Sequence, residues 1–317
     1  MIVLFTKIVF AGSVMLATLG FFNASGAAES SAACEPETGR VVWKRLTYQG
    51  KHFLGKVETT VSLVELSTLA AQKVLISIPD GSALQASTAR VMVLDVQSAV
   101  DPLFGATDIS GSRAWFTSDD AAALQRIRSR RGDDIWQNTY RFTKSGVYRQ
   151  RRKPGRTAEN KLTPEHWTKI KESFYPYLDT VPDSHAVLEP TGLLYFVSGL
   201  DFRKQTTPQK LYVFDRKQLH LVNVYASGSL RIKGDYLRKT MTDEVRKQEI
   251  IDAIRISFEP HALSPQGAQP EEFSFLGLKG KFEIYIDSTS RIPVQVTGTI
   301  KGPGKVSLKL REVELVR

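Results

Sequence analysis

Histidine, cysteine and serine side chains, which commonly carry metal and nucleophilic chemistry, give weak signals in this chain. The one cysteine is Cys34, and no two histidines have the spacing of a metal-binding motif, so the fold would have to assemble a zinc site from distant residues. Ser227 and Ser229 lie in YASGSL, which lacks the G-x-S-x-G elbow of a nucleophilic serine. The histidines are His52, His166, His185, His220 and His261.

Glycine-rich and acidic motifs add no stronger signal. The segment GTIKGPGKV resembles a phosphate-binding loop, but Val306 follows Lys305 where that loop needs Ser or Thr, and strands flank the segment on both sides. Adjacent acids such as Asp119 and Asp120 would point to opposite faces of a strand and could not share a proton. We therefore expect no cofactor, no metal ion and no enzymatic activity.

Positive charge is the most concentrated chemical feature of the chain. Between Arg126 and Glu172 there are fourteen Lys or Arg and five Asp or Glu, a surplus of nine, whereas the whole chain carries +10. Cations at this density attract polyanions. The alternative is a solvated hairpin whose arginines are balanced by acids distant in sequence. The candidate anion-binding residues are Arg141, Arg149, Arg151, Arg152, Lys153 and Arg156.

The first 28 residues indicate where such a polyanion would be met. Lys7, the apolar run Ile8–Phe22 and the small residues Asn23–Ala28 form the pattern of a cleavable signal peptide. We expect a periplasmic protein, for which anionic lipid, lipopolysaccharide, acidic glycan or an acidic protein face is a plausible partner and nucleic acid is not. The alternative is an uncleaved membrane anchor over residues 2–22.

Cysteine content and length predict the domain organisation. With Cys34 alone, no intramolecular disulfide can form. Lipid attachment at Cys34 is an alternative that the preceding Ser31-Ala32-Ala33 matches poorly. We predict a signal peptide over 1–28, a flexible arm over 29–39, and one domain over 40–317 with basic hairpins inserted at about 113–160.

Most of the remaining sequence favours β-strands bounded by turn formers. The run beginning near Ala122 is assigned as a strand, with a helix over Asp120–Arg130 as the alternative. Strands are predicted at Val41–Tyr48, Lys73–Ile78, Ala89–Val96, Arg113–Thr117, Trp136–Phe142, Val147–Gln150, Lys210–Phe214, Gln218–Tyr225, Ser229–Tyr236, Ile250–Phe258, Lys281–Asp287, Ile292–Ile300 and Lys305–Val316.

One helix has clear sequence signals. Thr163 suits an N-cap and Pro164 the first helical position, and Trp167, Ile170 and Phe174 recur at helical spacing. This pattern predicts a helix that ends near Tyr175-Pro176 and packs its apolar side on a sheet. The short apolar run 192–200 is ambiguous.

The last third of the chain alternates most regularly. Phe282, Ile284 and Ile286 should share a buried face. Pro293 should lie at a strand start or edge, because proline cannot donate a ladder hydrogen bond. In the last strand Val306, Leu308 and Leu310 share a face, but Val313 breaks that parity, which predicts a bulge near Arg311.

Two segments carry a family resemblance. FEIYID followed by SRIPVQVTGTI and a strand ending in REVELV, together with the opening VVWKRLTYQGKHFLGKVETTV, resembles an uncharacterised family of Gram-negative periplasmic proteins. That family is similar to the half-barrel of the periplasmic lipoprotein carrier and its outer-membrane receptor. The resemblance implies a curved antiparallel sheet with a helix across its concave side and an apolar or lipid-like ligand. It supplies no catalytic residue.

The sequence thus predicts a mainly β fold: a large curved antiparallel sheet, as a half-barrel or open barrel, with one or two helices. The expected function is that of a non-enzymatic periplasmic carrier or binding module for an apolar or lipid-like ligand. The alternative is an envelope structural or assembly factor that docks on acidic glycan, lipid or protein through residues 126–172. The candidate residues for the apolar ligand are Phe282, Ile284, Val306, Leu308 and Trp167.

Overall fold

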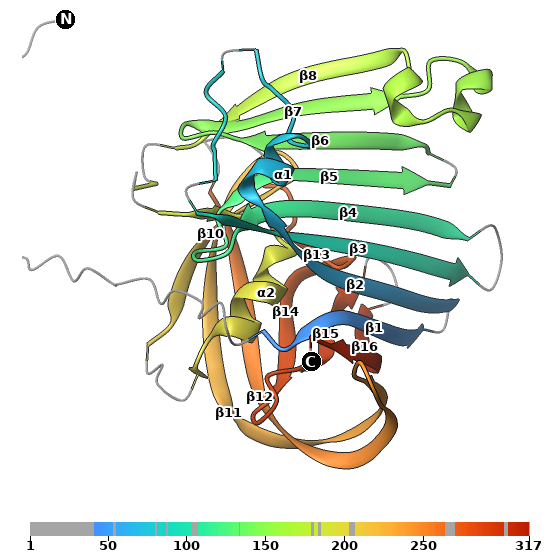
Figure 1. Cartoon of the computed structure of the whole chain (residues 1–317), viewed down its shortest axis with the longest axis vertical. Coiled ribbons are helices and arrows are strands. Elements are labelled where there is room, and N and C mark those ends of the chain that lie inside the picture. The colour runs from blue at the N-terminus through green and yellow to red at the C-terminus, as the bar shows by residue number, and fades with distance from the viewer. Residues whose placement is uncertain are drawn as a thin grey trace, which may run out of the picture. The chain divides into compact units, whose positions relative to one another are not determined.

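Within the described residues, sixteen strands form one mixed β-sheet in the computed structural model (Figure 1). The structure describes residues 41–52, 55–79, 81–86, 88–102, 107–132, 134–178, 181–182, 185–202, 207–263, 270–300 and 304–316. The predicted signal peptide, the arm and Cys34 lie outside these residues. The mainly β fold class is confirmed. The strands are β1 (Trp43–His52), β2 (Gly55–Ser67), β3 (Arg90–Pro102), β4 (Asp108–Thr117), β5 (Ala123–Arg131), β6 (Trp136–Phe142), β7 (Gly146–Lys153), β8 (Lys169–Pro176), β9 (Val187–Leu188), β10 (Gln209–Asp215), β11 (Gln218–Lys239), β12 (Glu244–Leu263), β13 (Ser274–Phe275), β14 (Leu278–Asp287), β15 (Pro293–Ile300) and β16 (Gly304–Leu315).

The strand order brings the first and last strands together. From β8 to β1 each strand pairs with its neighbour in sequence, and β1 then pairs with β16, which is followed by β15, β14, β12, β11, β10 and β9. Trp43 lies opposite Leu315 in the β1–β16 pair. Two pairs are parallel, β9–β10 and β11–β16, so the sheet is mixed although its hairpins are antiparallel.

Several local predictions are confirmed at residue level. The run from Ala122 becomes the strand β5, and β15 begins at Pro293. The predicted bulge is present: Thr47 pairs with Glu312 and Tyr48 with Leu310, which leaves Arg311 as the extra residue. This extra residue allows both Leu310 and Val313 to be buried.

The predicted strand at 73–78 is wrong. This segment follows helix α1 (Thr68–Gln72) and belongs to no strand of the sheet. Its backbone is instead bound by side chains: Gln125 donates to the Val74 carbonyl and accepts from the Ile76 amide, and Arg141 donates to the Ile76 carbonyl. Buried side chains thus satisfy an extended segment that has no strand neighbour.

The predicted helix at 163–175 is also wrong. Its start signals form only the short 3-10 turn η2 (Pro164–His166), which follows a second turn, η1 (Thr157–Lys161), and the strand β8 comes next. Ile170 and Phe174 are four residues apart, a separation that places two side chains on one face of a strand as well as of a helix. Both side chains are about half exposed, at 48% and 46%.

The ambiguous run at 192–200 forms the helix α2 (Gly192–Gly199), every residue of which is buried. A helix that is apolar on all sides needs cover on all sides. The hydroxyl of Tyr195 donates to the Ser118 carbonyl, and the indole of Trp43 donates to Ser198, so α2 is held from two different parts of the sheet. Figure 1 shows α2 between β2–β4 and β11–β14. No helix within the described ranges is long and apolar enough to cross a membrane.

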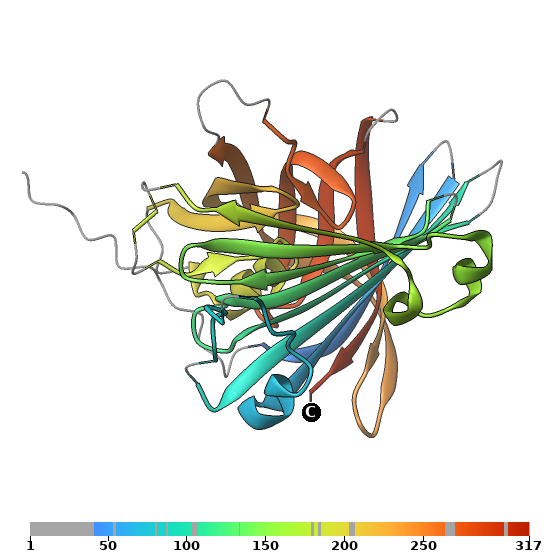
Figure 2. The same cartoon turned by 90° about the horizontal axis from the view of Figure 1, so that it is seen from above.

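The face of β4–β8 that points toward Phe214 of β10 is called the inner face here, and it has two chemically different ends. At one end Phe142 and Tyr175 pack around Phe214, with ring centroids 6.1 and 5.9 Å from it. Toward the other end the inner face is polar. Alternation along the strands places Arg128 and Arg151 on the same face as Phe142. The turns η1 and η2 lie beyond this polar end (Figure 2).

Candidate anion-binding cleft

A cleft of about 560 Å³ opens over the polar end of the inner face. One wall consists of β3–β7, and the other of the β10–β11 turn and the β13–β14 hairpin. We call it the cationic cleft, because eight of its lining residues are cations and only Asp108 and Glu271 are acids. The cations are Arg126, Arg128, Arg130, Arg149, Arg151, Arg216, Lys217 and Lys279.

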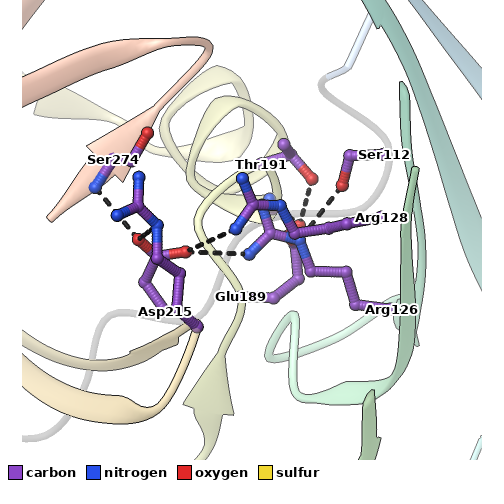
Figure 3. A network of polar contacts seen from close by, with 9 residues as sticks. Ser112, Arg126, Arg128, Glu189, Thr191, Asp215 and Ser274 are labelled. Carbon is purple, nitrogen blue, oxygen red and sulfur yellow. Dashed lines mark hydrogen bonds and ion pairs between the residues drawn. The ribbon is translucent and has the colours of Figure 1, made fainter. Parts of the chain in front are cut away.

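The deep end of the cleft is a closed ion-pair network (Figure 3). Arg126 of β5 is 5% exposed and lies 3.2 Å from both Asp215 and Glu189. Asp215 also accepts from the Ser274 amide at 3.1 Å and lies 3.7 Å from Arg128. The charge of Arg126 is therefore compensated inside the protein, as a buried charge requires.

Glu189 joins this network to helix α2. One of its carboxylate oxygens accepts from the amide of Gly192, the first residue of α2, and from the Thr191 hydroxyl. A carboxylate in this place adds a second acceptor for the Gly192 amide, beside the Glu189 carbonyl at 3.1 Å, and is favoured by the helix dipole. The buried helix thereby fixes the acid that orients Arg126.

The middle of the cleft holds arginines that lack such compensation. Arg149 is only 6% exposed, and its Cζ atom lies 5.2 Å from the centre of the Tyr175 ring. It has no acid partner within the described residues. Arg151 lies 5.8 Å from the centre of the Trp136 ring, which Arg128 approaches at 5.9 Å. The Nε atoms of Arg149 and Arg151 are both buried, and neither has a hydrogen-bond partner in the described ranges. Unpartnered donors of this kind are uncommon in folded proteins.

The opposite wall brings further cations toward these arginines. Burial, followed by repulsion from Arg216 and Arg128, lowers the pKa of Lys279. Burial, followed by repulsion from Arg126, likewise lowers the pKa of Arg128. Arg216 lies in the β10–β11 turn with φ of 58°, a left-handed conformation that costs a non-glycine residue energy. The turn thus keeps a side chain where glycine would fit better.

The cleft carries a positive surplus even after its ion pairs are counted. Arg130 is bound by Asp108 at 2.7 Å and Lys217 by Glu271 at 3.1 Å, while Glu189 and Asp215 stand behind Arg126. Against the eight lining cations these four acids leave four positive charges. Low-dielectric walls strengthen the field of such a surplus toward an anion.

The structure brings together only two of the six predicted anion-binding residues. Arg149 and Arg151 line the cationic cleft, but the other four do not. Arg141 lies outside the cleft: it is 1% exposed and donates to the carbonyls of Ile76, Leu84 and Leu124, so its donors serve the fold. Burial lowers its pKa to about 10.

The remaining three lie around the turns η1 and η2. Arg152 follows Arg151 and so points to the opposite face of β7, where it donates to the Glu165 carbonyl at 3.1 Å. Lys153 pairs with Asp134 at 2.7 Å. Arg156 is exposed at the start of η1.

The predicted apolar ligand residues are all buried. Phe282, Ile284, Val306 and Leu308 are at most 3% exposed and belong to the main hydrophobic core. Trp167 lies apart from them, in the η1–η2 segment, where its indole donates to the Glu159 carbonyl at 3.0 Å. These five side chains therefore do not form one site.

Sequence reasoning missed most of the cleft. Arg126, Arg128 and Arg130 lie within the basic segment, and their period of two in a predicted strand was an available signal that they share a face. Arg216 and Lys279 carried no such signal, because only the long-range strand order places their turns opposite β5 and β7. Among the described residues no group of His, Cys, Asp and Glu could hold a metal ion.

Comparisons with known proteins find similarity only among solved structures, where three chains match. No family model matches the chain, and no curated protein matches it. Among solved structures it is similar to the crystal structure of a β-barrel-like protein of a domain of unknown function, DUF1849, from Brucella abortus. The two share 8% sequence identity at a TM-score of 0.45, over 87% of this chain and 98% of that one. That description names a barrel-like fold without an assigned function and does not name the lipoprotein carrier or its receptor.

Proposed function

We propose that this protein is a non-enzymatic binding protein that holds a multiply charged anion in the cationic cleft. The observation that carries the proposal is Arg149: its guanidinium is 6% exposed, forms part of the cleft wall, and has no acid partner among the residues that the structure describes. A buried charge without a partner is costly. An anion that enters the cleft supplies the missing partner.

The cleft geometry supports a multiply charged ligand over a single small ion. Arg149 and Arg151 project from β7, while Arg216 and Lys279 approach from the other wall. Arginine forks bind carboxylate and phosphate groups through two parallel hydrogen bonds. Several anionic groups on one molecule would engage both walls at once.

The apolar-carrier function has less support. Its candidate residues Phe282 and Ile284 pack in the core, where the Phe282 ring stacks on Phe258 and Phe275 at 4.4 Å. A smaller cleft of about 300 Å³ touches Phe258 and Phe282, but charged residues such as Lys281 and Glu283 surround it. The proposal therefore follows the alternative prediction, in which the basic residues 126–172 bind an acidic partner. We keep export to the periplasm as part of the proposal.

Isothermal titration calorimetry at low ionic strength tests the proposal. Tripolyphosphate and trigalacturonate serve as probes, and the double variant Arg149→Gln/Arg151→Gln removes the two unpaired guanidiniums. We expect saturable binding by the unmodified protein, at least about a tenfold weaker affinity in the variant, and weaker binding as salt rises.

The matched control is Arg231→Gln/Arg246→Gln, which removes the same charge from exposed sites on the β11–β12 hairpin. This control should bind the probes like the unmodified protein. Absence of saturable binding of either probe, or equal losses in both double variants, would show that the cleft is not an anion site.

A further inference from the structure

The cationic cleft also contains an orphan acceptor, which a simple anion cannot satisfy. Asn138 of β6 is 6% exposed, and its Oδ1 atom is buried with no hydrogen-bond partner among the described residues. A carboxylate or a fully ionised phosphate carries only acceptors, so the group opposite Asn138 must bring a donor. A ligand that satisfies the cleft must therefore carry both negative charge and a hydroxyl or N–H group.

Strand register places this acceptor between two of the cations. Asn138 pairs with Arg128 on one side and with Arg151 on the other. Neighbouring strands lie about 4.8 Å apart. One small molecule could therefore place acceptors against Arg128 and Arg151 and a donor against Asn138 between them. Hydroxyl-bearing Ser110, Ser112 and Ser129 also line this part of the cleft.

The same row of residues continues to the edge of the sheet. Lys171 of β8 pairs with Arg151, is exposed, and makes no ion pair within the described residues. From Lys171 to Arg128 the row crosses three strand spacings, about 15 Å. We call the residues Ser112, Arg128, Asn138, Arg151 and Lys171 the polar row.

From these observations we infer that the ligand of the cleft is an acidic oligosaccharide that lies along the polar row, with carboxylates on the arginines and a hydroxyl on Asn138. This inference rests on the proposed anion-binding function and names its ligand class. A sugar chain with acidic groups provides closely spaced charge and hydroxyl donors, whereas polyphosphate provides charge without sugar hydroxyls. The exposed end of the row at β8 lets a longer chain extend beyond the cleft.

Titrations with oligogalacturonates of one, three and six residues test the inference, with tripolyphosphate as the hydroxyl-free comparator. Affinity should rise by about tenfold or more from the monomer to the hexamer, as charges along the row are engaged together. Lys171→Gln should weaken hexamer binding several-fold and leave monomer binding unchanged. Lys233→Gln, an exposed lysine of β11, is its matched control.

Asn138→Ala separates the hydroxyl requirement from folding. The variant should bind trigalacturonate about fivefold more weakly, the size of one lost hydrogen bond, while tripolyphosphate binding stays unchanged and shows that the cleft is intact.

The inference is overturned if affinity does not depend on oligomer length, or if Asn138→Ala weakens both probes alike or neither. Binding of tripolyphosphate with no binding of galacturonates would also overturn it while leaving the proposed anion-binding function standing. Failure of every anion to bind would refute that function instead.

Discussion

Arginines of one sheet face have different environments in this protein. Arg126 on β5 is enclosed by Glu189 and Asp215. Arg149, two strands away, is equally buried but pairs with no acid in the described part of the chain. Removing an acid partner of Arg126 would leave a buried charge without compensation in a low dielectric. Arg149 already has such an uncompensated charge in the free protein. For this reason we assign ligand binding to Arg149 and a structural role to Arg126.

The turn residue Arg216 should show a conflict between stability and binding. Its φ of 58° is favourable for glycine and strained for arginine. We expect Arg216→Gly to retain the stability of the unmodified protein in urea unfolding while its affinity for tripolyphosphate falls. A large loss of stability in this variant would show that the arginine side chain holds the turn rather than serving a ligand.

His220 should make stability depend on pH. It is 2% exposed, its Nε2 has no hydrogen bond to any described residue, and burial lowers its pKa below the ordinary value of 6.5. As pH falls below about 6.5 the unfolded chain binds a proton before the folded protein does, so this contribution to stability is present above that pH and is lost below it. Urea midpoints between pH 7.5 and pH 5 should fall less in His220→Gln than in the unmodified protein. The exposed His261→Gln variant should behave like the unmodified protein.

Among the elements, the segment between β7 and β8 has its two ends joined by one carboxylate. Glu159 of η1 accepts hydrogen bonds from the amides of Gly155 and Thr168 at 2.8 and 2.9 Å, and these bonds lower its pKa. We expect Glu159→Ala to speed amide hydrogen exchange at Gly155 and Thr168. Amides of β6 in the same sample are the internal control. They should stay protected, because the β7–β8 segment lies outside the hydrophobic core clusters and its loosening does not disturb the sheet.

The C-terminal strands should behave as a packed core. Phe282 stacks on two phenylalanine rings and is 2% exposed, so Phe282→Ala should lower the free energy of unfolding by about 3–5 kcal/mol. Phe174→Ala, on a side chain that is 46% exposed, is the comparison and should cost much less. A small loss in Phe282→Ala, measured by urea unfolding, would instead indicate an interior cavity of the kind a lipid carrier needs.

Local patterns in the sequence predicted the strands well because alternation, turn residues and proline act over a few neighbours. The Arg311 bulge and the start of β15 at Pro293 follow from such short-range rules. The prediction of a helix at 163–175 was wrong because side chains four residues apart share a face in a strand as well as in a helix. Arg141 and Lys279 could not be assigned, because the groups that bury the first and oppose the second come from distant parts of the chain.

For the whole molecule, export remains a prediction from the first 28 residues. We expect the mature N-terminus to fall between about residues 28 and 34 when the protein is produced with its full sequence in a Gram-negative host. Intact mass spectrometry of the periplasmic fraction measures this. Retention of Met1 to Phe22 in the membrane fraction would contradict it, and a diacylglycerol adduct on Cys34 would assign the protein to the lipoproteins.

The pairing of β1 with β16 also has a consequence for biosynthesis. Val316 donates to the Val42 carbonyl at 2.9 Å, so the two ends of the domain meet in space. During synthesis or translocation β1 and β2 emerge first, and the β1 edge stays open until the last strand arrives, which makes closure slow and leaves that edge exposed to other chains. A circular permutant that links these ends and begins instead in the turn between β11 and β12 would keep every strand pair and present β1 and β16 as consecutive strands.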